Sequence, residues 1–391
     1  MKKVKHLVLW PLQLASVVIA TGLLCAYMAR WISPAATWFF AFFGLFFLPL
    51  LVLNIGMTGC WLMAKRKIGW LHLLVVLPAL FFLPAYVQLR SVADTVAPLQ
   101  DGELKILSYN VHLFRLNTKT KTEETLPAVA RFVKEEAPAI VCLQEVALYD
   151  TNRVKQAFSD YPYVHFQSRK IFGNALFSTV TLSRYPMVYK DAIIFPNSGN
   201  VCIFTDIAIG GQTVRVYNNH LESTRLDLAL SFARLQQEEK RNEEIKQVST
   251  RLRDAFIKRA EQVDTVAAHI ARSPYPALVC GDFNDLPMSY TYRRMKDNRH
   301  DTFIDAGSGI PSTFRSGIPA FRIDYIFCDT TFKTIRSYIP KVIYSDHYPV
   351  VAVVRRLNID VKRACGGCCP KDDGCGFYDC PRATKVVLLK K

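Results

Sequence analysis

Six short polar strings stand at or near the ends of segments that have the composition of β-strands. They contain carboxylates, carboxamides and imidazoles, the side chains that bind hard metal ions and transfer protons. The strings are Ser108-Tyr109-Asn110-Val111-His112, Gln144-Glu145, Asn218-Asn219-His220-Leu221-Glu222-Ser223, Gly281-Asp282-Phe283-Asn284-Asp285, Arg322-Ile323-Asp324-Tyr325 and Ser345-Asp346-His347-Tyr348-Pro349. Polar groups that converge from several strand ends indicate one active site assembled from loops on a rigid scaffold.

This set of side chains suits metal-assisted hydrolysis of a phosphate ester. Carboxylate and carboxamide oxygens favour Mg²⁺ or Mn²⁺, which also bind phosphate oxygens directly. A bound cation polarises the phosphoryl group and stabilises charge on the departing oxygen. A separate carboxylate can orient or deprotonate the attacking water, and a histidine can contact the phosphate or protonate the leaving group.

The elements that must position these residues alternate between strands and helices. Strands are expected at 104–107, 139–143, 175–182, 201–209, 213–218, 277–279, 323–328 and 350–354. Helices are expected at 123–136, closed before Pro138, and over the charged stretch 231–271, which has room for two. Gly210-Gly211 is typical of a hairpin turn between two of the strands. This order indicates a mixed α/β domain.

The six strings, in this order, resemble those of the endonuclease/exonuclease/phosphatase superfamily over roughly residues 104–355. The combination of Gln-Glu, Gly-Asp-Phe-Asn and Ser-Asp-His-x-Pro-Val is specific, whereas any one of these motifs alone is weak. The resemblance implies an α/β (α+β) fold, a four-layer αββα sandwich in which two β-sheets pack face to face with helices outside.

The resemblance also implies which residues bind metal and activate water. Glu145 matches the principal metal ligand, assisted by Asn110 and Asp346. Asp282 matches the residue that orients or deprotonates the water, and Asn284 matches a residue that supports the phosphate. Mg²⁺ or Mn²⁺ is the cofactor expected.

The remaining matched residues would handle the phosphate and the leaving group. His347 matches the phosphate-contacting histidine, and Asp324 its carboxylate partner, which would fix the imidazole tautomer. His220 matches a second histidine, a candidate general acid, with Asn218 beside it. One position departs from some apurinic endonucleases, because His112 stands where those enzymes have an Asp. This difference leaves open whether the site binds one metal ion or two.

A membrane region precedes this domain. Residues 1–93 contain no Asp or Glu, and three apolar stretches, roughly 7–29, 35–64 and 68–89, each reach the length of a membrane-spanning helix. The second stretch is longer than a span requires, so it must tilt, bend at Pro49 or run past the bilayer. The sequence therefore predicts three transmembrane helices before the sandwich.

The flanking basic residues predict the orientation of these helices. Lys2, Lys3 and Lys5 precede the first stretch, and Lys65, Arg66 and Lys67 separate the second from the third, whereas the other two ends carry only Arg30 and Arg90. Because cytoplasmic loops carry the excess of Lys and Arg, the N-terminus is expected inside. We expect a multi-pass protein of the cell (inner) membrane with a periplasmic or extracellular catalytic domain.

The charge and the cysteine content of the remaining chain help to divide it into domains. Beyond the membrane region, 41 basic residues face 33 acidic ones, a mild excess that suits phosphate substrates or anionic membranes without choosing between them. Cys365, Cys368, Cys369, Cys375 and Cys380 crowd the tail and could form disulfides, join a metal site or have no catalytic part. The expected divisions are membrane region 1–91, linker 92–103, catalytic domain 104–357 and Cys-rich tail 358–391.

Two functions remain open at this point. The first is a metal-dependent phosphodiesterase, nuclease or phosphatase acting on a lipid headgroup, a nucleotide or nucleic acid outside the cytoplasm. The second is a non-catalytic, membrane-anchored binding module with the same fold. Glu145, Asp282 and His347 are all present, which favours the enzyme.

Overall fold

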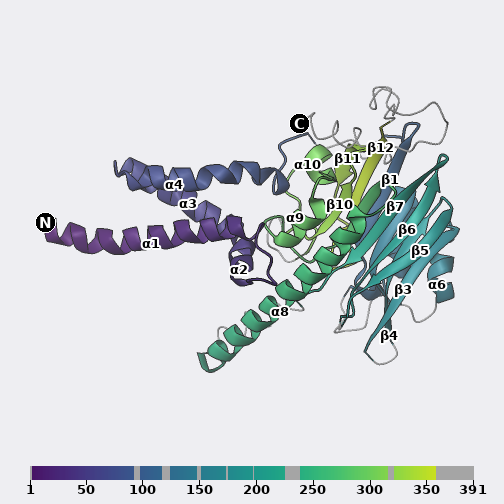
Figure 1. Cartoon of the computed structure of the whole chain (residues 1–391), viewed down its shortest axis with the longest axis horizontal. Coiled ribbons are helices and arrows are strands. Elements are labelled where there is room, and N and C mark those ends of the chain that lie inside the picture. Colours follow the sequence, from purple (N-terminus) through teal and green to yellow (C-terminus); the bar gives the residue numbers. More distant parts are fainter. Residues whose placement is uncertain are drawn as a thin grey trace.

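Two large β-sheets and a group of N-terminal helices make up the protein (Figure 1). This computed structural model describes residues 2–91, 97–116, 124–147, 151–172, 175–196, 198–224, 238–315 and 321–357. The Cys-rich tail, part of the expected linker (92–96) and the first residues of the expected helix at 231–271 lie outside the described residues.

Each sheet has six strands among the described residues. The first has the order β11 (Phe332–Tyr338), β12 (Val350–Arg356), β1 (Glu103–Asn110), β2 (Ile140–Ala147), β4 (Ala175–Ser183) and β3 (Tyr163–Phe172). The second has the order β5 (Met187–Ile194), β6 (Val201–Ile209), β7 (Gln212–His220), β8 (Ala277–Asp282), β10 (Asp324–Cys328) and β9 (His300–Asp301). Only β1–β2 and β7–β8 pair in parallel among these neighbours.

Three apolar layers hold the sandwich together. Alternate residues of β1 explain the arrangement: Ile106 packs between the sheets, while Leu107 and Tyr109 pack under the outer helices α5 (Leu126–Glu136) and α6 (Thr151–Ala157). The other outer face lies under α8 (Glu238–Ala271), α9 (Tyr290–Lys296) and α10 (Thr302–Ala306). Strands buried on both faces need continuous apolar runs, which the sequence supplies. The expected sandwich of two packed sheets with helices outside is confirmed.

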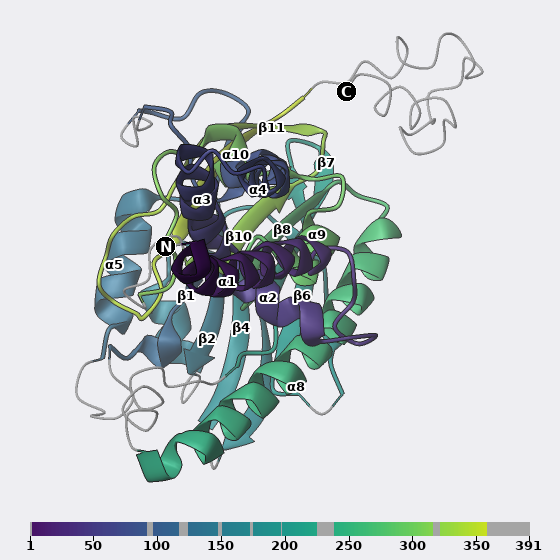
Figure 2. The ribbon, with the colours of Figure 1, turned by 90° about the vertical axis from the view of Figure 1, so that its left-hand side faces the viewer.

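The N-terminal helices project from one end of this sandwich. They are α1 (Lys2–Met28), α2 (Phe39–Leu45), α3 (Phe47–Met63) and α4 (Ile68–Val76), followed by the 3₁₀ turns η1 (Leu77–Phe81) and η2 (Leu83–Ala85). Figure 2 looks toward their N-terminal side, with the sandwich behind them. α1 runs toward the sandwich, α3 leads away from it, and α4 returns (Figure 1).

The expectation of three long membrane helices is met only in part. Among the described residues, one helix, Trp10–Met28, is long and apolar enough to cross a membrane; α2 and α3 would make a second only as a pair bent by 70°. The third apolar helix, Ile68–Phe81, is shorter than a regular span.

Prolines account for both differences. Pro49 has no N–H to donate to the carbonyl of Leu45, and its ring would collide with that carbonyl in a continuous helix. The break falls at Phe46, between the two helices, so Pro49 sits harmlessly in the first turn of α3. Pro78 and Pro84 similarly stand in the 3₁₀ turns that end the third stretch.

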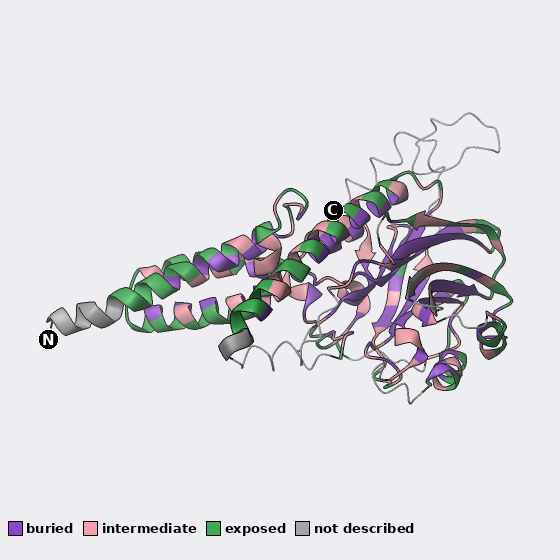
Figure 3. Cartoon of the chain, turned by 90° about the horizontal axis from the view of Figure 1, so that it is seen from below, coloured by how far each residue is buried: buried purple, intermediate pink, exposed green. Residues whose placement is uncertain are grey.

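Polar side chains lie inside the group of N-terminal helices. The Asn54 amide donates to the carbonyls of Ile19 and Leu50, and its oxygen lies 2.9 Å from Nδ1 of His72. The outer faces of the described helices are largely exposed, as the green ribbon of Figure 3 shows, and they carry large apolar side chains. This is the reverse of the sandwich, where apolar residues are buried.

Candidate active site

Strand ends of both sheets meet at one edge of the sandwich. Asn110 ends β1 and Glu145 lies near the end of β2, and these strands run in parallel. His220 ends β7 and Asp282 ends β8, the parallel pair of the other sheet, and the two residues face each other in register. The sequence therefore places four polar groups at the same edge, because parallel strands carry their C-terminal ends to the same side.

Gly281 permits the close approach of β7 and β8 beside Asp282. Its φ is +134°, a region that L side chains rarely adopt, and a Cβ at this position would collide with the carbonyl oxygen of Asn219. The Gly-Asp-Phe-Asn motif thus begins with glycine for a steric reason, and Asp282 follows it as the last residue of β8.

Asn110 joins the two sheets at the centre of the site. Its amide Nδ2 donates to Glu145 Oε1 at 3.2 Å and to Asp282 Oδ2 at 3.0 Å. Its oxygen accepts from the backbone N–H of His112 at 3.1 Å. Asn110 therefore holds two carboxylates of different strands at a fixed separation.

Glu145 stands in an irregular part of β2. The β2–β4 register shifts between Leu143 and Val146, and Glu145 has a φ of +52°, an uncommon conformation for this residue type. Burial disfavours its charge, but His220, 3.3 Å away, and the charges of His112 and His347 lower the pKa of Glu145 to about 2. Glu145 is thus an anion at neutral pH.

The pKa of His220 is shifted in the opposite direction. Burial alone would lower its pKa, but the carboxylates of Glu145 and Asp282 outweigh that effect and raise the pKa of His220 above its usual value. Its side chain is 14% exposed and that of Glu145 is 22% exposed, so both reach the more open side of the site.

Asp282, Asp324 and His347 form a buried group below this open side. Asp324 begins β10 and is the register partner of Asp282, which places the two carboxylates on adjacent strands. His347 Nδ1 lies 2.9 Å from Asp324 Oδ2, and His347 Nε2 lies 3.8 Å from Asp282 Oδ2. The structure therefore brings together the imidazole and the carboxylate partner that the sequence predicts.

Burial and neighbouring charges shift the protonation of this group. Burial, followed by the charge of Asp324, raises the pKa of Asp282 to about 6. Burial would lower the pKa of His347, but Asp324 and Asp282 hold it well above its usual value. His347 is therefore a cation that can donate a hydrogen bond to an anionic ligand.

Asn284 is fixed beside Asp282 by three hydrogen bonds. Its backbone N–H donates to Asp282 Oδ1 at 2.8 Å, and its amide donates to Asp282 Oδ2 at 3.3 Å and to the Leu221 carbonyl at 2.9 Å. Its φ is +52°. The residue thus lies within the site, as expected, with its amide hydrogens directed at protein acceptors.

Asp346 and His112 lie at the open side of the site. Asp346 is 37% exposed, and its Oδ1 lies 3.6 Å from Nδ1 of His112. Ser345 Oγ donates to the Asn110 carbonyl at 2.8 Å and accepts from the N–H of His347 at 3.2 Å, which ties the Ser-Asp-His motif to β1. No role was predicted for His112 or Ser345, although both stand inside the matched strings.

Asn218 lies apart from this cluster, between the sheets. It is fully buried, its amide donates to the carbonyls of Leu143 and Val180, and its oxygen accepts from Gln144 Nε2 at 2.7 Å. These bonds occupy its polar atoms with β2 and β4. The structure does not bring Asn218 into contact with the proposed reacting groups.

Two sets of residues could hold a metal ion. Among the described residues, Asp282, Asp324 and His347 bring one ligand atom each within 4.8 Å of one another. A cationic histidine is a poor metal ligand, because metal binding requires the neutral ring. Glu145, an anion on the open side, and the half-exposed carboxylate of Asp346 fit a hard cation better.

One further ion pair holds the loop after β8. Asp285 Oδ2 lies 3.1 Å from Nη1 of Arg259, a residue of α8 that is 1% exposed. The Tyr325 hydroxyl donates to the Asp285 carbonyl at 2.8 Å. Asp285 was assigned no role from the sequence, and no local pattern indicates a partner on a helix 26 positions earlier.

Several solved structures are similar to this chain, and the first one described here supports the fold. An endonuclease/exonuclease/phosphatase from Beutenbergia cavernae DSM 12333 has a TM-score of 0.50 and 20% identity, covering 65% of this chain and 72% of its own. The chain is also similar to a D. rerio TDP2 humanized by 14 mutations, with a TM-score of 0.48 and 17% identity, covering 65% of this chain and 100% of that one. It is similar as well to the human Nocturnin catalytic domain with bound sulfate, with a TM-score of 0.48 and 17% identity, covering 66% of this chain and 96% of that one.

Family models cover both parts of the chain. No curated protein matches it significantly. Residues 5–86 match a domain of unknown function. Residues 107–347, which are more than half of the chain and include every residue of the site described above, match the Endonuclease/Exonuclease/phosphatase family model. The chain belongs to the endonuclease/exonuclease/phosphatase family.

Proposed function

We propose that this protein is a divalent-metal-dependent hydrolase of phosphate esters. The observation that carries the proposal is the chain of contacts through Glu145, Asn110, Asp282, His347 and Asp324, which joins strand ends of both sheets. In this cluster Glu145 would bind the metal, beside the buried carboxylate of Asp282 and the cationic His347. Membership of the family supports the same chemistry.

Glu145 and Asp346, with Asn110, would hold Mg²⁺ or Mn²⁺. When bound, the cation would polarise the phosphoryl group and stabilise charge on the leaving oxygen. The oxygen of Asn110 accepts from His112 in this structure, and a carbonyl oxygen has a second lone pair available for a ligand. The two carboxylates therefore carry most of the metal assignment.

The remaining residues would act on water and phosphate. Asp282 would orient the attacking water and accept its proton, with Asn284 placed beside it to support the phosphate. His347 would donate to a phosphate oxygen, while Asp324 holds its ring in place. His220 would protonate the leaving oxygen, a role that its raised pKa permits.

The N-terminal helices would anchor this domain in a membrane by three crossings. The nine residues of α4 at about 1.5 Å each and the following 3₁₀ segment to Ala85 at about 2.0 Å each extend roughly 30 Å, the thickness of a hydrocarbon core. Trp10 and Trp31, 68% and 57% exposed, bracket the first span as interfacial tryptophans do.

The domain would lie outside the cytoplasm, near a phosphate ester at the membrane. The basic residues 65–67 stand in the turn between α3 and α4, at the end of the helices far from the sandwich. The excess of positive charge there favours a cytoplasmic location for that end. Lipid headgroups, nucleotides and nucleic acids are the substrate classes to compare.

Substitution of the assigned residues tests the catalytic proposal. The full chain in detergent should hydrolyse bis(p-nitrophenyl) phosphate with Mg²⁺ or Mn²⁺, lose the activity in EDTA and recover it on metal addition. Asp282→Asn should lower kcat by ~10² or more while Mn²⁺ affinity, followed by electron paramagnetic resonance, persists. Glu145→Gln should weaken Mn²⁺ binding, and excess metal should partly restore its rate.

Asp254→Asn is the matched control for Asp282→Asn. Asp254 is 51% exposed and pairs with its neighbour Arg253 on the surface of α8, so its variant should keep the wild-type rate. Hydrolysis that survives chelation, or an Asp282→Asn enzyme with wild-type kcat, would contradict the mechanism. A chain that binds Mn²⁺ but hydrolyses none of the three substrate classes would indicate a binding module instead.

The location can be tested with a reporter fused after Arg355. Alkaline phosphatase, which needs export, should be active at this position, because three crossings from an internal N-terminus end outside. A cytoplasm-dependent reporter at the same position should be inactive. The opposite pattern would overturn the external placement.

A further inference from the structure

The segment that follows Asp282 connects the active site to the N-terminal helices. This segment, residues 283–289, is called the catalytic loop here. Its second residue is the Asn284 that bonds to Asp282, and it ends at Ser289, the N-cap of α9. Met288 lies only four positions after Asn284. A displacement at Met288 can therefore reach the site through a few backbone bonds.

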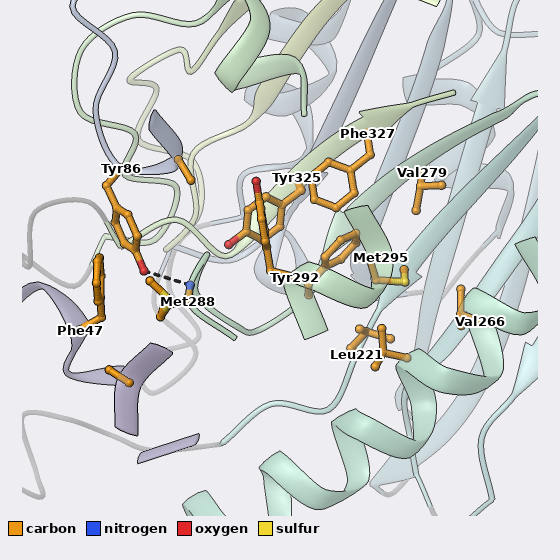
Figure 4. Close-up of a cluster of buried hydrophobic side chains, with 14 of the residues drawn as sticks. Phe47, Tyr86, Leu221, Val266, Val279, Met288, Tyr292, Met295, Tyr325 and Phe327 are labelled. Carbon is orange, nitrogen blue, oxygen red and sulfur yellow. Dashed lines mark hydrogen bonds between the residues drawn. The ribbon is translucent and has the colours of Figure 1, made fainter. Parts of the chain in front are cut away.

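N-terminal residues hold the far end of the catalytic loop through its backbone. The Met288 N–H donates to the Tyr86 hydroxyl at 3.0 Å, the dashed line in Figure 4. Arg30 Nη1 donates to the Pro287 carbonyl at 2.6 Å. A Cβ on Gly44 would lie 2.7 Å from the Met288 carbonyl oxygen, so α2 rests directly against the loop.

Aromatic packing makes this contact part of a continuous core. Phe47 and Tyr86 have ring centroids 5.4 Å apart, and Figure 4 shows both beside Met288. Across the loop, Tyr292 and Tyr325 pack with centroids 5.2 Å apart. All five residues belong to one buried cluster that includes residues of both the helices and the sandwich.

The helices and the sandwich restrain different parts of the loop. Arg259 and Tyr325 bind Asp285, near its start. Tyr86 and Arg30 bind Met288 and Pro287, near its end, by the bonds described above. The residues of the sandwich and those of the N-terminal helices contact different positions of the loop, so the position of the loop depends on both.

We propose that the N-terminal helical region braces the catalytic loop, with Tyr86, Arg30 and Gly44 as positioning residues of the active site. This role belongs to a region whose family model has no function assigned, and it rests on the proposed function of the site. Any shift of the helices relative to one another at Gly44 or Tyr86 would move the loop. Catalysis is sensitive to such movement, since a displacement of 1 Å can cost ~10² in rate.

Two pairs of variants test the brace in the full chain. Tyr86→Phe removes the hydrogen bond to Met288, whereas Tyr27→Phe removes a comparable buried bond to the Val75 carbonyl within the helices. Gly44→Ala forces its new Cβ against the Met288 carbonyl and against Ala29 of the N-terminal region, whereas a Cβ at Gly56 of α3 would meet nothing within 4 Å. Each pair applies the same chemical change with and without contact to the loop.

Kinetics and hydrogen exchange give independent readouts. We expect kcat for bis(p-nitrophenyl) phosphate to fall roughly tenfold in Tyr86→Phe and further in Gly44→Ala, with smaller changes in KM and Mn²⁺ affinity. Amides of residues 283–289 should exchange faster in both, by mass spectrometry. Tyr27→Phe and Gly56→Ala should keep wild-type kcat and loop exchange.

The outcomes separate the brace from the proposed function. Faster loop exchange in Tyr86→Phe and Gly44→Ala supports the brace even if no substrate is hydrolysed, in which case the catalytic proposal alone fails. Unchanged exchange in both variants overturns the brace, whatever the activity. Equal losses of kcat in Tyr86→Phe and Tyr27→Phe would show general destabilisation and also overturn it.

Discussion

The N-terminal helices and the sandwich distribute their polar and apolar residues in opposite ways. Of the 33 large apolar side chains exposed among the described residues, 22 lie between Trp10 and Leu89. Inside the helices, buried Asn54 and His72 share a hydrogen bond, and Trp61 donates to Ser16. In the sandwich most large apolar side chains are buried, and Ile106 and Ile140 are fully buried between the sheets.

The difference is what the proposed membrane anchoring requires, because one chain would then fold toward two solvents. Apolar side chains that face lipid lose nothing by exposure, and association of the helices then depends on packing and on polar contacts such as Asn54–His72. The sandwich gains its stability by removing apolar surface from water. The aromatic cluster around Tyr86 and Met288 lies where the two arrangements meet, which is why it is continuous with both.

The largest expected difference in stability between the two regions comes from adding a charge to an exposed position of each. Val52 of α3 and Val188 of β5 are 67% and 60% exposed. If α3 faces lipid, Val52→Lys should cost about 3 kcal/mol or more and prevent stable insertion, because a Lys in the middle of a span is expensive. Val188→Lys on a hydrated strand should stay within about 0.5 kcal/mol of wild type.

Membrane fractionation and thermal unfolding of the two lysine variants check this prediction. Val52→Lys should leave the membrane fraction or be degraded, while Val188→Lys should accumulate and melt as wild type does. Normal insertion and stability of Val52→Lys would break the comparison, since that result would mean that α3 faces water.

A smaller effect is expected from acid, through the buried histidine of the sandwich. His165 of β3 lies between the sheets, with Nδ1 2.7 Å from the Thr205 hydroxyl oxygen. Burial and the charge of Lys190 lower the pKa of His165 to about 4 from 6.5. The neutral ring therefore stabilises the fold fully above pH 6.5, and that stability is lost as the pH falls toward 4.

The loss at pH 5 should reach roughly 2 kcal/mol, because the unfolded ring is then mostly protonated and the folded one is not. Denaturant unfolding of wild type and His165→Gln at pH 7 and pH 5 measures it. The glutamine retains a hydrogen-bonding side chain without titrating, so the variant should show a correspondingly smaller decrease. If the free energy of unfolding decreased equally in both proteins, His165 would not be the source of the acid sensitivity.

Central strands could be predicted from the sequence, and edge strands could not. β1, β2, β8 and β12 are buried on both faces and therefore appear as continuous apolar runs. β5 is an edge strand with mostly exposed residues, including Lys190 and Asp191, and has no such run. β3 and β11 were missed for the same reason, since each lies at the edge of its sheet.

The candidate site was predictable where its residues stand in local motifs. Asp282 and Asn284 sit two positions apart, and His347 follows Asp346, so the strings locate them. Asn218 also stands in a string, but it faces the interior and is held by Leu143 and Val180. Its role depends on the residues of the opposite sheet that contact it, and no local sequence pattern predicts them. The positions of Asp285 and Arg259 depend on tertiary structure in the same way.

The left-handed backbone of Glu145 has a consequence for directed evolution. A φ of +52° costs a glutamate on the order of 1 kcal/mol, and glycine would avoid this cost. Glycine would also remove the carboxylate that pairs with His220 and accepts from the Asn110 amide. A library screened for heat resistance alone would therefore select on the balance of backbone strain against these contacts and not on the proposed metal ligand, so such a screen needs a parallel assay for turnover or metal affinity.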